Sequence, residues 1–225
     1  MLETLAPVFT PDNLRFIWSG MGLTLALSVG VVCLSIPLGA ALGLLRNYER
    51  FVLGRLAAAY IEVFRNTPLL LWMFTFGFLV PGGGSSLSTR GGLALLLYTA
   101  SVIAEIVRGG LNSISRGQFE AAQSQGFTFL QTLWYIILPQ AFRRIVPSLL
   151  SQVITTVKDT SFLAGFGVLE FFRTVQVVLS KSGGNRTAIF ALYVFAALGY
   201  FVVCFSLSCV VRATQRRRSV TAAAH

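Results

Sequence analysis

The sequence has 225 residues, of which 55% are hydrophobic and 12% are charged, and its mean hydropathy is +0.73. This composition exceeds what the core of a soluble domain of that size needs, so it excludes an ordinary soluble protein and indicates an integral membrane protein. A net charge of +10 would point to nucleic acid in a soluble protein. Here the arginines gather where membrane topology explains them, so we expect no nucleic-acid partner.

Charge-free apolar windows predict where the chain crosses the membrane. Residues 16–45, 66–89 and 187–211 contain no Asp, Glu, Lys or Arg. A helix needs about 20 apolar residues to cross a hydrocarbon core about 30 Å thick. Two further apolar stretches carry charges near their ends, where such side chains can reach the interface. The sequence therefore predicts an all-α protein with five transmembrane helices, at 18–45, 57–80, 91–111, 140–160 and 187–211.

The first residues, which include Glu3 and Asp12, lack the basic region of a signal peptide. We therefore expect a short outer segment over residues 1–15, followed by a first helix that stays in the mature protein. That helix contains Gly39-x-x-x-Gly43, a spacing of small residues that lets helices approach closely. Ordinary packing is the favoured interpretation, and a dimer seam is the alternative.

The segments between the helices predict how the chain is oriented. Residues 46–56 form a short basic loop, the turn Pro81-Gly-Gly-Gly-Ser-Ser ends the second helix, and the tail beyond residue 211 is rich in arginine. By the positive-inside rule, these basic segments place the N-terminus in the periplasm and the C-terminus in the cytoplasm. The apolar outer segment 161–186 is expected to pack as short helices, and the fourth helix to bend or break near Pro147.

The long inner loop 112–138 contains a predicted short helix. Ser115-x-x-Gln118 fits a capping box that starts this helix near residue 116. Gly126 stands where a left-handed glycine ends a helix. So short a helix is marginal alone and needs a surface to pack on. Leu138-Pro139 is expected to break the chain before the fourth membrane helix.

The same loop resembles the EAA loop of the permease subunits of bacterial ABC importers. All fixed positions of that motif are present at the family's spacing, namely Glu120, Ala121, Ala122, Gly126, Ile136, Leu138 and Pro139. The resemblance implies a type I ABC importer fold, with residues 1–225 as one transmembrane domain in the bacterial inner membrane. It also implies that Glu120, Ala121, Ala122 and Gly126 couple the permease to an ATPase. The alternative is an amphipathic interfacial loop without a docking role.

Further motifs resemble the polar amino acid branch of this family. They are Phe64-Arg65-Asn66-Thr67-Pro68-Leu69-Leu70, Ala104-Glu105-Ile106-Val107-Arg108-Gly109-Gly110, Leu138-Pro139-Gln140-Ala141 and Lys158-Asp159-Thr160-Ser161. The run Phe171-Phe172-Arg173-Thr174 is more similar to glutamate/aspartate permeases, which makes glutamate or aspartate the first choice of substrate. Glutamine and basic amino acids are alternatives. The rival functions are an ATP-independent channel or carrier and a purely structural assembly subunit.

Ionisable and polar groups in or beside membrane spans are costly, so they mark a candidate substrate pathway. A zwitterionic amino acid needs an acceptor for its ammonium group and a donor for its carboxylate. The alternative is that Glu62 with Arg65, and Glu105 with Arg108, neutralise one another from positions three residues apart. We favour this structural pairing for those four residues. The candidate pathway residues are Arg65, Asn66, Glu105, Lys158, Asp159, Thr160 and Ser161.

The chain has no G-x-x-x-x-G-K-[ST] motif and no Gly-Lys dipeptide, so we expect a transport subunit and not an enzyme. Three cysteines and the single His225 offer no plausible metal cluster, and we expect no metal or cofactor on this chain. The resemblance implies that ATP and Mg bind to a partner ATPase dimer. It also implies a second permease subunit, more readily a paralogue than an identical copy, and a periplasmic or lipid-anchored solute-binding protein.

Overall fold

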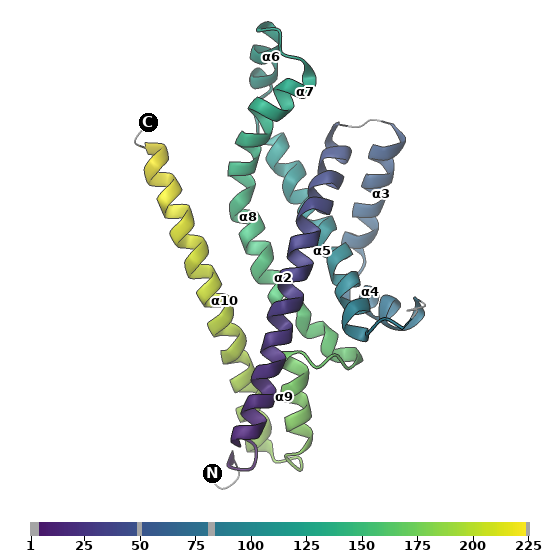
Figure 1. Cartoon of the computed structure of the whole chain (residues 1–225), viewed down its shortest axis with the longest axis vertical. Coiled ribbons are helices and arrows are strands. Elements are labelled where there is room, and N and C mark those ends of the chain that lie inside the picture. The colour runs from purple at the N-terminus through teal and green to yellow at the C-terminus, as the bar shows by residue number, and fades with distance from the viewer. Residues whose placement is uncertain (1–4, 49–50, 81–83, 224–225) are drawn as a thin grey trace. The chain divides into compact units, whose positions relative to one another are not determined.

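The computed structural model describes residues 5–48, 51–80 and 84–223, and every regular element in these ranges is a helix (Figure 1). The predicted turn at residues 81–83 lies outside them. The helices in chain order are α2 (Pro11–Tyr48), α3 (Val52–Asn66), α4 (Leu69–Phe74), the π-helix η1 (Thr75–Leu79), α5 (Leu87–Asn112), α6 (Arg116–Ser124), α7 (Phe129–Thr132), the π-helix η2 (Leu133–Ile137), α8 (Leu138–Asp159), the 3₁₀-helix η3 (Thr160–Phe166), α9 (Phe171–Ser180) and α10 (Arg186–Ala223).

In the part of the chain that is described, three helices are long and apolar enough to cross a membrane: Pro11–Tyr48, Leu87–Asn112 and Arg186–Ala213. A fourth span results if Phe129–Phe166 and Phe171–Ser180, which are bent by 42°, count as one. The all-α prediction is thereby confirmed, and the count of five spans stays a prediction.

The predicted continuous helix at 57–80 is wrong in one respect, because it is split into α3 and α4. Thr67 has an extended backbone, with φ −113° and ψ 135°. The cause is Pro68, since the ring of a proline disfavours the helical conformation of the residue before it. Proline in a helix interior does not act alike everywhere: α8 runs through Pro147 without a break, so the expected break is wrong and the expected bend stays a prediction.

The first helix starts earlier than predicted. Residues 1–15 were expected to form an outer segment, yet α2 begins at Pro11. The Thr10 hydroxyl accepts a hydrogen bond of 3.2 Å from the Asn13 amide, as an N-cap residue does. Pro11 then occupies the first helical position, where its missing N–H costs nothing. Hydropathy does not mark this start, because the first turns of the helix are polar.

By internal contacts the chain divides into two compact units. The first comprises Met1–Val32, Leu69–Leu95 and Val153–His225, and the second comprises Cys33–Pro68 and Leu96–Gln152. The boundary runs through the long helices α2, α5 and α8.

The first unit is built around α9, whose apolar face lies against α2 and α10. Phe171, Val175 and Val178 are almost fully buried there, together with Ile17 and Leu192. Glycines allow the close approach: a Cβ on Gly20 would lie 2.6 Å from the Thr174 hydroxyl, and one on Gly199 would collide with the Phe171 ring. The expectation that 161–186 contains short helices is confirmed by η3 and α9.

A buried carboxylate, Glu170, joins three elements of this unit. As the N-cap of α9, it accepts hydrogen bonds from the amides of Phe172 (3.0 Å) and Arg173 (2.6 Å). Its Oε2 also accepts from the Tyr200 hydroxyl of α10 at 3.0 Å and the Thr24 hydroxyl of α2 at 3.4 Å. The side chain is 0% exposed, so these donors replace the water that a carboxylate otherwise requires.

The second unit packs α2 against α5 through the glycine pair noted in the sequence. A Cβ on Gly39 would lie 2.7 Å from the Ala100 carbonyl and from Ile103, and one on Gly43 would lie 2.6 Å from the Ala104 carbonyl. The pair therefore serves ordinary packing within the chain, as favoured. Next to it lies a core cluster that includes Ile103, Val107 and Ile137.

We predict that Glu170→Ala lowers the free energy of unfolding by at least about 2 kcal/mol, because each buried donor left without an acceptor costs about 1–3 kcal/mol. Tyr200→Phe, which removes one of the donors and leaves the cap in place, should cost about 1 kcal/mol. Thermal unfolding of the purified protein in detergent measures both. Equal unfolding temperatures for wild type and Glu170→Ala would contradict the role of this carboxylate.

Candidate functional site

The predicted short helix in the central loop is present as α6, Arg116–Ser124. Its start is as predicted, but the capping box at Ser115 is wrong, since the Ser115 side chain makes no cap hydrogen bond. The other half of the box is missing as well, because the Gln118 side chain accepts a hydrogen bond of 3.1 Å from the side-chain amide of Gln140. A capping box does occur further along: Thr128 and Gln131 satisfy each other's backbone amides at the start of α7, a pattern equally visible in the sequence.

The end of α6 is as predicted. Gly126 has φ +82°, in the left-handed region that favours glycine. Its amide donates to the Gln123 carbonyl at 2.9 Å, and the Phe127 amide donates to the Ala122 carbonyl at 3.1 Å. These two bonds form a Schellman motif, which closes the helix without further support.

The motif residues of α6 divide between an inner and an outer face. Ala122 is 4% exposed and packs inward, whereas Glu120, Ala121 and Gly126 are exposed. The helix thus exposes a charged residue beside a small one.

The C-terminal part of the motif, Leu138-Pro139, does not break the helix as expected: the π-helix η2 continues directly into α8 at Leu138. Pro139 therefore stands inside a continuous helical stretch, two residues after the π-helix ends.

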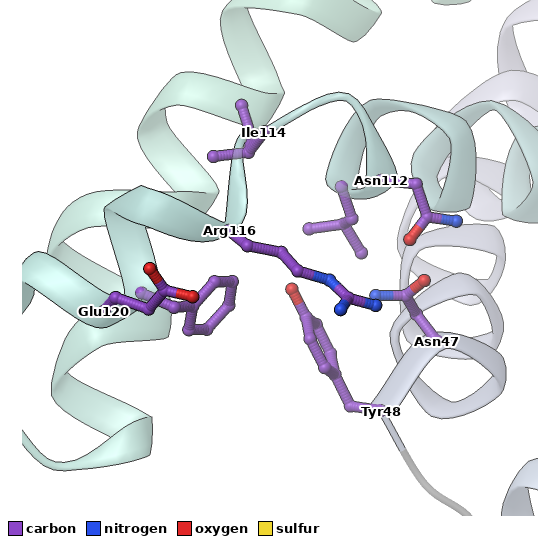
Figure 2. A pocket seen from close by; sticks show the side chains of 8 residues that line it. Asn47, Tyr48, Asn112, Ile114, Arg116 and Glu120 are labelled. Carbon is purple, nitrogen blue, oxygen red and sulfur yellow. The ribbon is translucent and has the colours of Figure 1, made fainter. Parts of the chain in front are cut away.

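A pocket of about 430 Å³ lies beside α6 (Figure 2). Figure 2 shows the Arg116 side chain extending from the start of α6 toward Asn47 and the Tyr48 ring at the end of α2. The guanidinium, carboxylate, amide and hydroxyl groups around the pocket can pair with either sign of charge. Sequence reasoning missed Asn47, Tyr48 and Asn112, because nothing in a single sequence indicates that the end of α2 lies beside the loop. The lining residues are Asn47, Tyr48, Leu111, Asn112, Ile114, Arg116, Phe119 and Glu120.

Two acidic and three basic side chains of the second unit form a network centred on Glu105. Arg46 lies 3.1 Å from Glu105 and 2.9 Å from Glu62. Arg65 lies 3.3 Å from Glu105, and Arg108 donates to both Glu105 oxygens at 2.9 and 2.8 Å. The side chain of Glu105 is 16% exposed, so it is the partly buried hub of the group. We call these residues the charge network: Arg46, Glu62, Arg65, Glu105 and Arg108.

The charge network partly agrees with the predicted pairings. The Glu105–Arg108 pair is confirmed, whereas in the described part of the chain Glu62 pairs with Arg46 and not with Arg65. The cause is that the last turn of α2 brings Arg46 within reach of both acids. Sequence reasoning placed Arg46 only in a basic loop. The substrate-contacting role of Arg65 and Glu105 stays a prediction.

The other predicted pathway residues lie at the junction of α8 and η3 in the first unit. Thr160 is buried, and its hydroxyl donates a hydrogen bond of 2.8 Å to the Val157 carbonyl. Asp159 and Ser161 are half-buried, and Lys158 is exposed. Asn66, in the second unit, is also exposed. The described residues contain no group of three His, Cys, Asp or Glu side chains that could hold a metal ion.

Residues 35–220 match the model of a protein family described as the inner membrane component of binding-protein-dependent transport systems. The chain belongs to this family. It is 36% identical over 213 residues to the probable glutamine ABC transporter permease protein GlnP of Bacillus subtilis (strain 168), covering 94% of this chain and 97% of the relative. It is 34% identical over 215 residues to the glutamate/aspartate import permease protein GltK of Escherichia coli O157:H7, covering 91% and 94%.

Solved structures share the fold. The chain superposes on the crystal structure of an amino acid ABC transporter with histidines with a TM-score of 0.82 at 27% identity, covering 92% of this chain and 95% of the other. It also superposes on the inward-facing MetNI methionine ABC transporter with a TM-score of 0.71 at 23% identity, covering 91% and 99%, which shows the fold alone.

Membership in this family confirms several predictions from the sequence. The chain is a multi-pass inner membrane protein with the type I importer permease fold. It is the transport component of an ABC importer and no enzyme; its partners are an ATPase, which binds the ATP, and a solute-binding protein.

We predict that Glu105→Gln destabilises the permease by about 2 kcal/mol, because hydrogen bonds to charged groups contribute about 1.5–3 kcal/mol and Glu105 accepts from several arginines. Glu62→Gln is the matched control: its side chain is 60% exposed and pairs only with Arg46 within the described residues, so it should cost below about 1 kcal/mol. Thermal unfolding in detergent compares the two. A larger loss for Glu62→Gln would contradict the central place of Glu105.

Proposed function

We propose that this permease moves a polar amino acid across the inner membrane by alternating access, driven by ATP hydrolysis in its partner. Glutamate or aspartate is the first choice of substrate, and glutamine is the nearest alternative. The support for the class is that relatives named for glutamine and for glutamate/aspartate match at similar identity, 36% and 34%. The support for an acidic substrate is the run Phe171-Phe172-Arg173-Thr174 at the start of α9.

The proposed assembly is the one that family membership implies. Five spans within one transmembrane domain place the N-terminus in the periplasm and the arginine-rich C-terminus in the cytoplasm, in keeping with the positive-inside rule. Two permease subunits, of which the second is a paralogue, surround a central pathway above two ATPase subunits. A periplasmic or lipid-anchored binding protein delivers the amino acid. Arg65, Asn66, Glu105 and the run Lys158-Asp159-Thr160-Ser161 are the proposed pathway residues.

The observation that carries the coupling role is the geometry of α6. This helix is short, closed by Gly126, and exposes Glu120 and Ala121 while it buries Ala122. An exposed small residue permits close contact with a partner, and an exposed carboxylate can pair with a basic or hydrogen-bonding group. We propose that this face enters the cleft of the ATPase, with Glu120, Ala121, Ala122 and Gly126 as coupling residues. A channel or an ATP-independent carrier has no use for such a face.

We predict that Glu120→Lys weakens association with the cognate ATPase at least about tenfold, because a reversed charge in an interface costs several kcal/mol. Gly126→Pro should do the same, since proline cannot adopt φ +82° and loses the N–H that donates to Gln123. Co-purification with the ATPase and ATP-driven uptake measure both variants.

The matched control for the charge reversal is Asp12→Lys, which changes another exposed acid, in the first turn of α2, whose side chain is 93% exposed. That variant should bind the ATPase as the wild type does. If Glu120→Lys kept both association and ATP-driven uptake, the coupling role of α6 would be disproved.

For the pathway, we predict that Asp159→Ala lowers uptake of labelled glutamate about tenfold without loss of ATPase association, a change of about 1.4 kcal/mol. Asp159 is the last residue of α8, is half-buried, and precedes the buried Thr160. Its carboxylate can accept hydrogen bonds from the ammonium group of a substrate. Lys181→Ala, which removes an exposed charge outside the pathway, is the control. Unchanged uptake in Asp159→Ala would remove Asp159 from the site, and stronger competition by glutamine than by aspartate would favour the alternative substrate.

A further inference from the structure

The helix α6 is too short to hold its position by itself, whereas α7 continues through η2 into α8. α6 has 9 residues. An isolated helix of that length is unstable in water, so its position is set by side chains that contact the rest of the unit. In α6, all of which the structure describes, only Ala122 is buried, and an alanine offers little contact area. Larger side chains must therefore help to hold α6, in addition to the hydrogen bond between Gln118 and Gln140.

Three aromatic rings supply this contact, one from each of α2, α6 and α7. The Tyr48 ring lies edge-on to Phe129, with centroids 5.4 Å apart, and edge-on to Phe119 at 6.3 Å. Phe119 and Phe129 are stacked, with centroids 6.3 Å apart and an angle of 16° between the rings. Both arrangements are ones that aromatic pairs prefer. We call Tyr48, Phe119 and Phe129 the aromatic cluster.

The residue that α2 contributes to the aromatic cluster lies in the same helical turn as a residue of the charge network. Tyr48 ends α2, and Arg46 precedes it by two positions. Arg46 pairs with Glu62 of α3 at 2.9 Å and with Glu105 of α5 at 3.1 Å. The last turn of α2 is therefore fixed on one side to α6 and α7 through rings, and on the other to α3 and α5 through ion pairs.

We propose that the aromatic cluster transmits movement of α6 to the end of α2 and to α7, the start of the helix that continues into α8, with Tyr48 as the positioning residue and Arg46 as the connection to α3 and α5. Coupling between distant sites requires a contiguous set of packed or ion-paired side chains, and this is such a set. The inference rests on the proposed docking of α6 to the ATPase. It goes beyond that docking because Tyr48 lies outside the EAA motif and Phe129 occupies one of its variable positions.

The test uses the complete transporter in proteoliposomes with its binding protein, and it measures the amount of substrate imported per ATP hydrolysed. Tyr48→Ala should keep the ATPase bound and hydrolysing ATP while import per ATP falls at least tenfold. Tyr48→Phe should restore the ratio to within twofold of wild type, since the ring contacts need no hydroxyl. Phe129→Leu should lower the ratio as well, and combining it with Tyr48→Leu should add little to either single defect.

The control is Phe190→Ala, which removes a ring that is 72% exposed on α10, and it should leave the ratio unchanged. Normal import per ATP in Tyr48→Ala would overturn the inference. So would a defect in Tyr48→Phe as large as that in Tyr48→Ala, or loss of the ATPase from the Tyr48→Ala transporter, which would make Tyr48 a docking residue. If Tyr48→Ala does not fold, Tyr48→Leu and Phe129→Leu decide by the same ratio.

Glu120→Lys in the same proteoliposomes separates this inference from the docking proposal. If Glu120→Lys retains the ATPase and wild-type import, the docking proposal fails regardless of the Tyr48 series. If Glu120→Lys loses the ATPase and Tyr48→Ala imports normally per ATP, docking stands and transmission through the aromatic cluster fails.

Discussion

Hydrocarbon offers no hydrogen-bonding partner to a peptide group, so every backbone amide and carbonyl of a membrane chain must be satisfied within the protein. This constraint explains why the described residues form only helices, and it makes the helix ends the demanding places of the fold. At the start of α9 the amides of Phe172 and Arg173 are satisfied by Glu170. At the end of α6 the amides of Gly126 and Phe127 turn back onto the helix. In each case one residue type with the right chemistry decides where a helix ends or begins.

The same lack of water governs the charged side chains. A partly buried carboxylate must find cations or donors nearby, because the cost of desolvation is otherwise not offset. Glu105 finds three arginines and Glu170 finds two hydroxyls besides its backbone amides. Both acids thus join helices that are far apart in the sequence: Glu105 joins α2, α3 and α5, and Glu170 joins α2, α9 and α10. Stability and relative position of the helices within each unit therefore depend on the same few polar contacts.

What the sequence predicts well is what local chemistry decides. Composition and charge-free windows predict an all-helical membrane chain, and the placement of Gly126 predicts the end of α6, because a left-handed residue after a helix strongly favours glycine. The split at Thr67–Pro68 was also predictable from the proline. A hydropathy average over a window of residues does not register a single proline, so the charge-free window predicts one helix. The partners of Glu62 and Glu170 were not predictable, since Arg46 and Thr24 come from α2, and helical spacing alone cannot exclude a competitor from another helix.

The division between exposed and engaged residues in the central loop bears on how an importer of this kind uses ATP. If α6 contacted the membrane helices through the face that carries Glu120, that face would not be free for the proposed docking. If α6 contacted no other helix, its movement would not reach them. The structure has α6 attached through Phe119 and Ala122 on one side and free at Glu120 and Ala121 on the other. Attachment by ring contacts also differs from attachment by ion pairs. Ring contacts are short-ranged and depend on ring orientation, whereas the charge attraction of Arg46 falls only as the inverse of distance and is shared between Glu62 and Glu105. The orientation-dependent ring contacts therefore lie next to the exposed face of α6, and the ion pairs join the same last turn of α2 to α3 and α5, so a displacement of α6 reaches Arg46 through the Tyr48 ring.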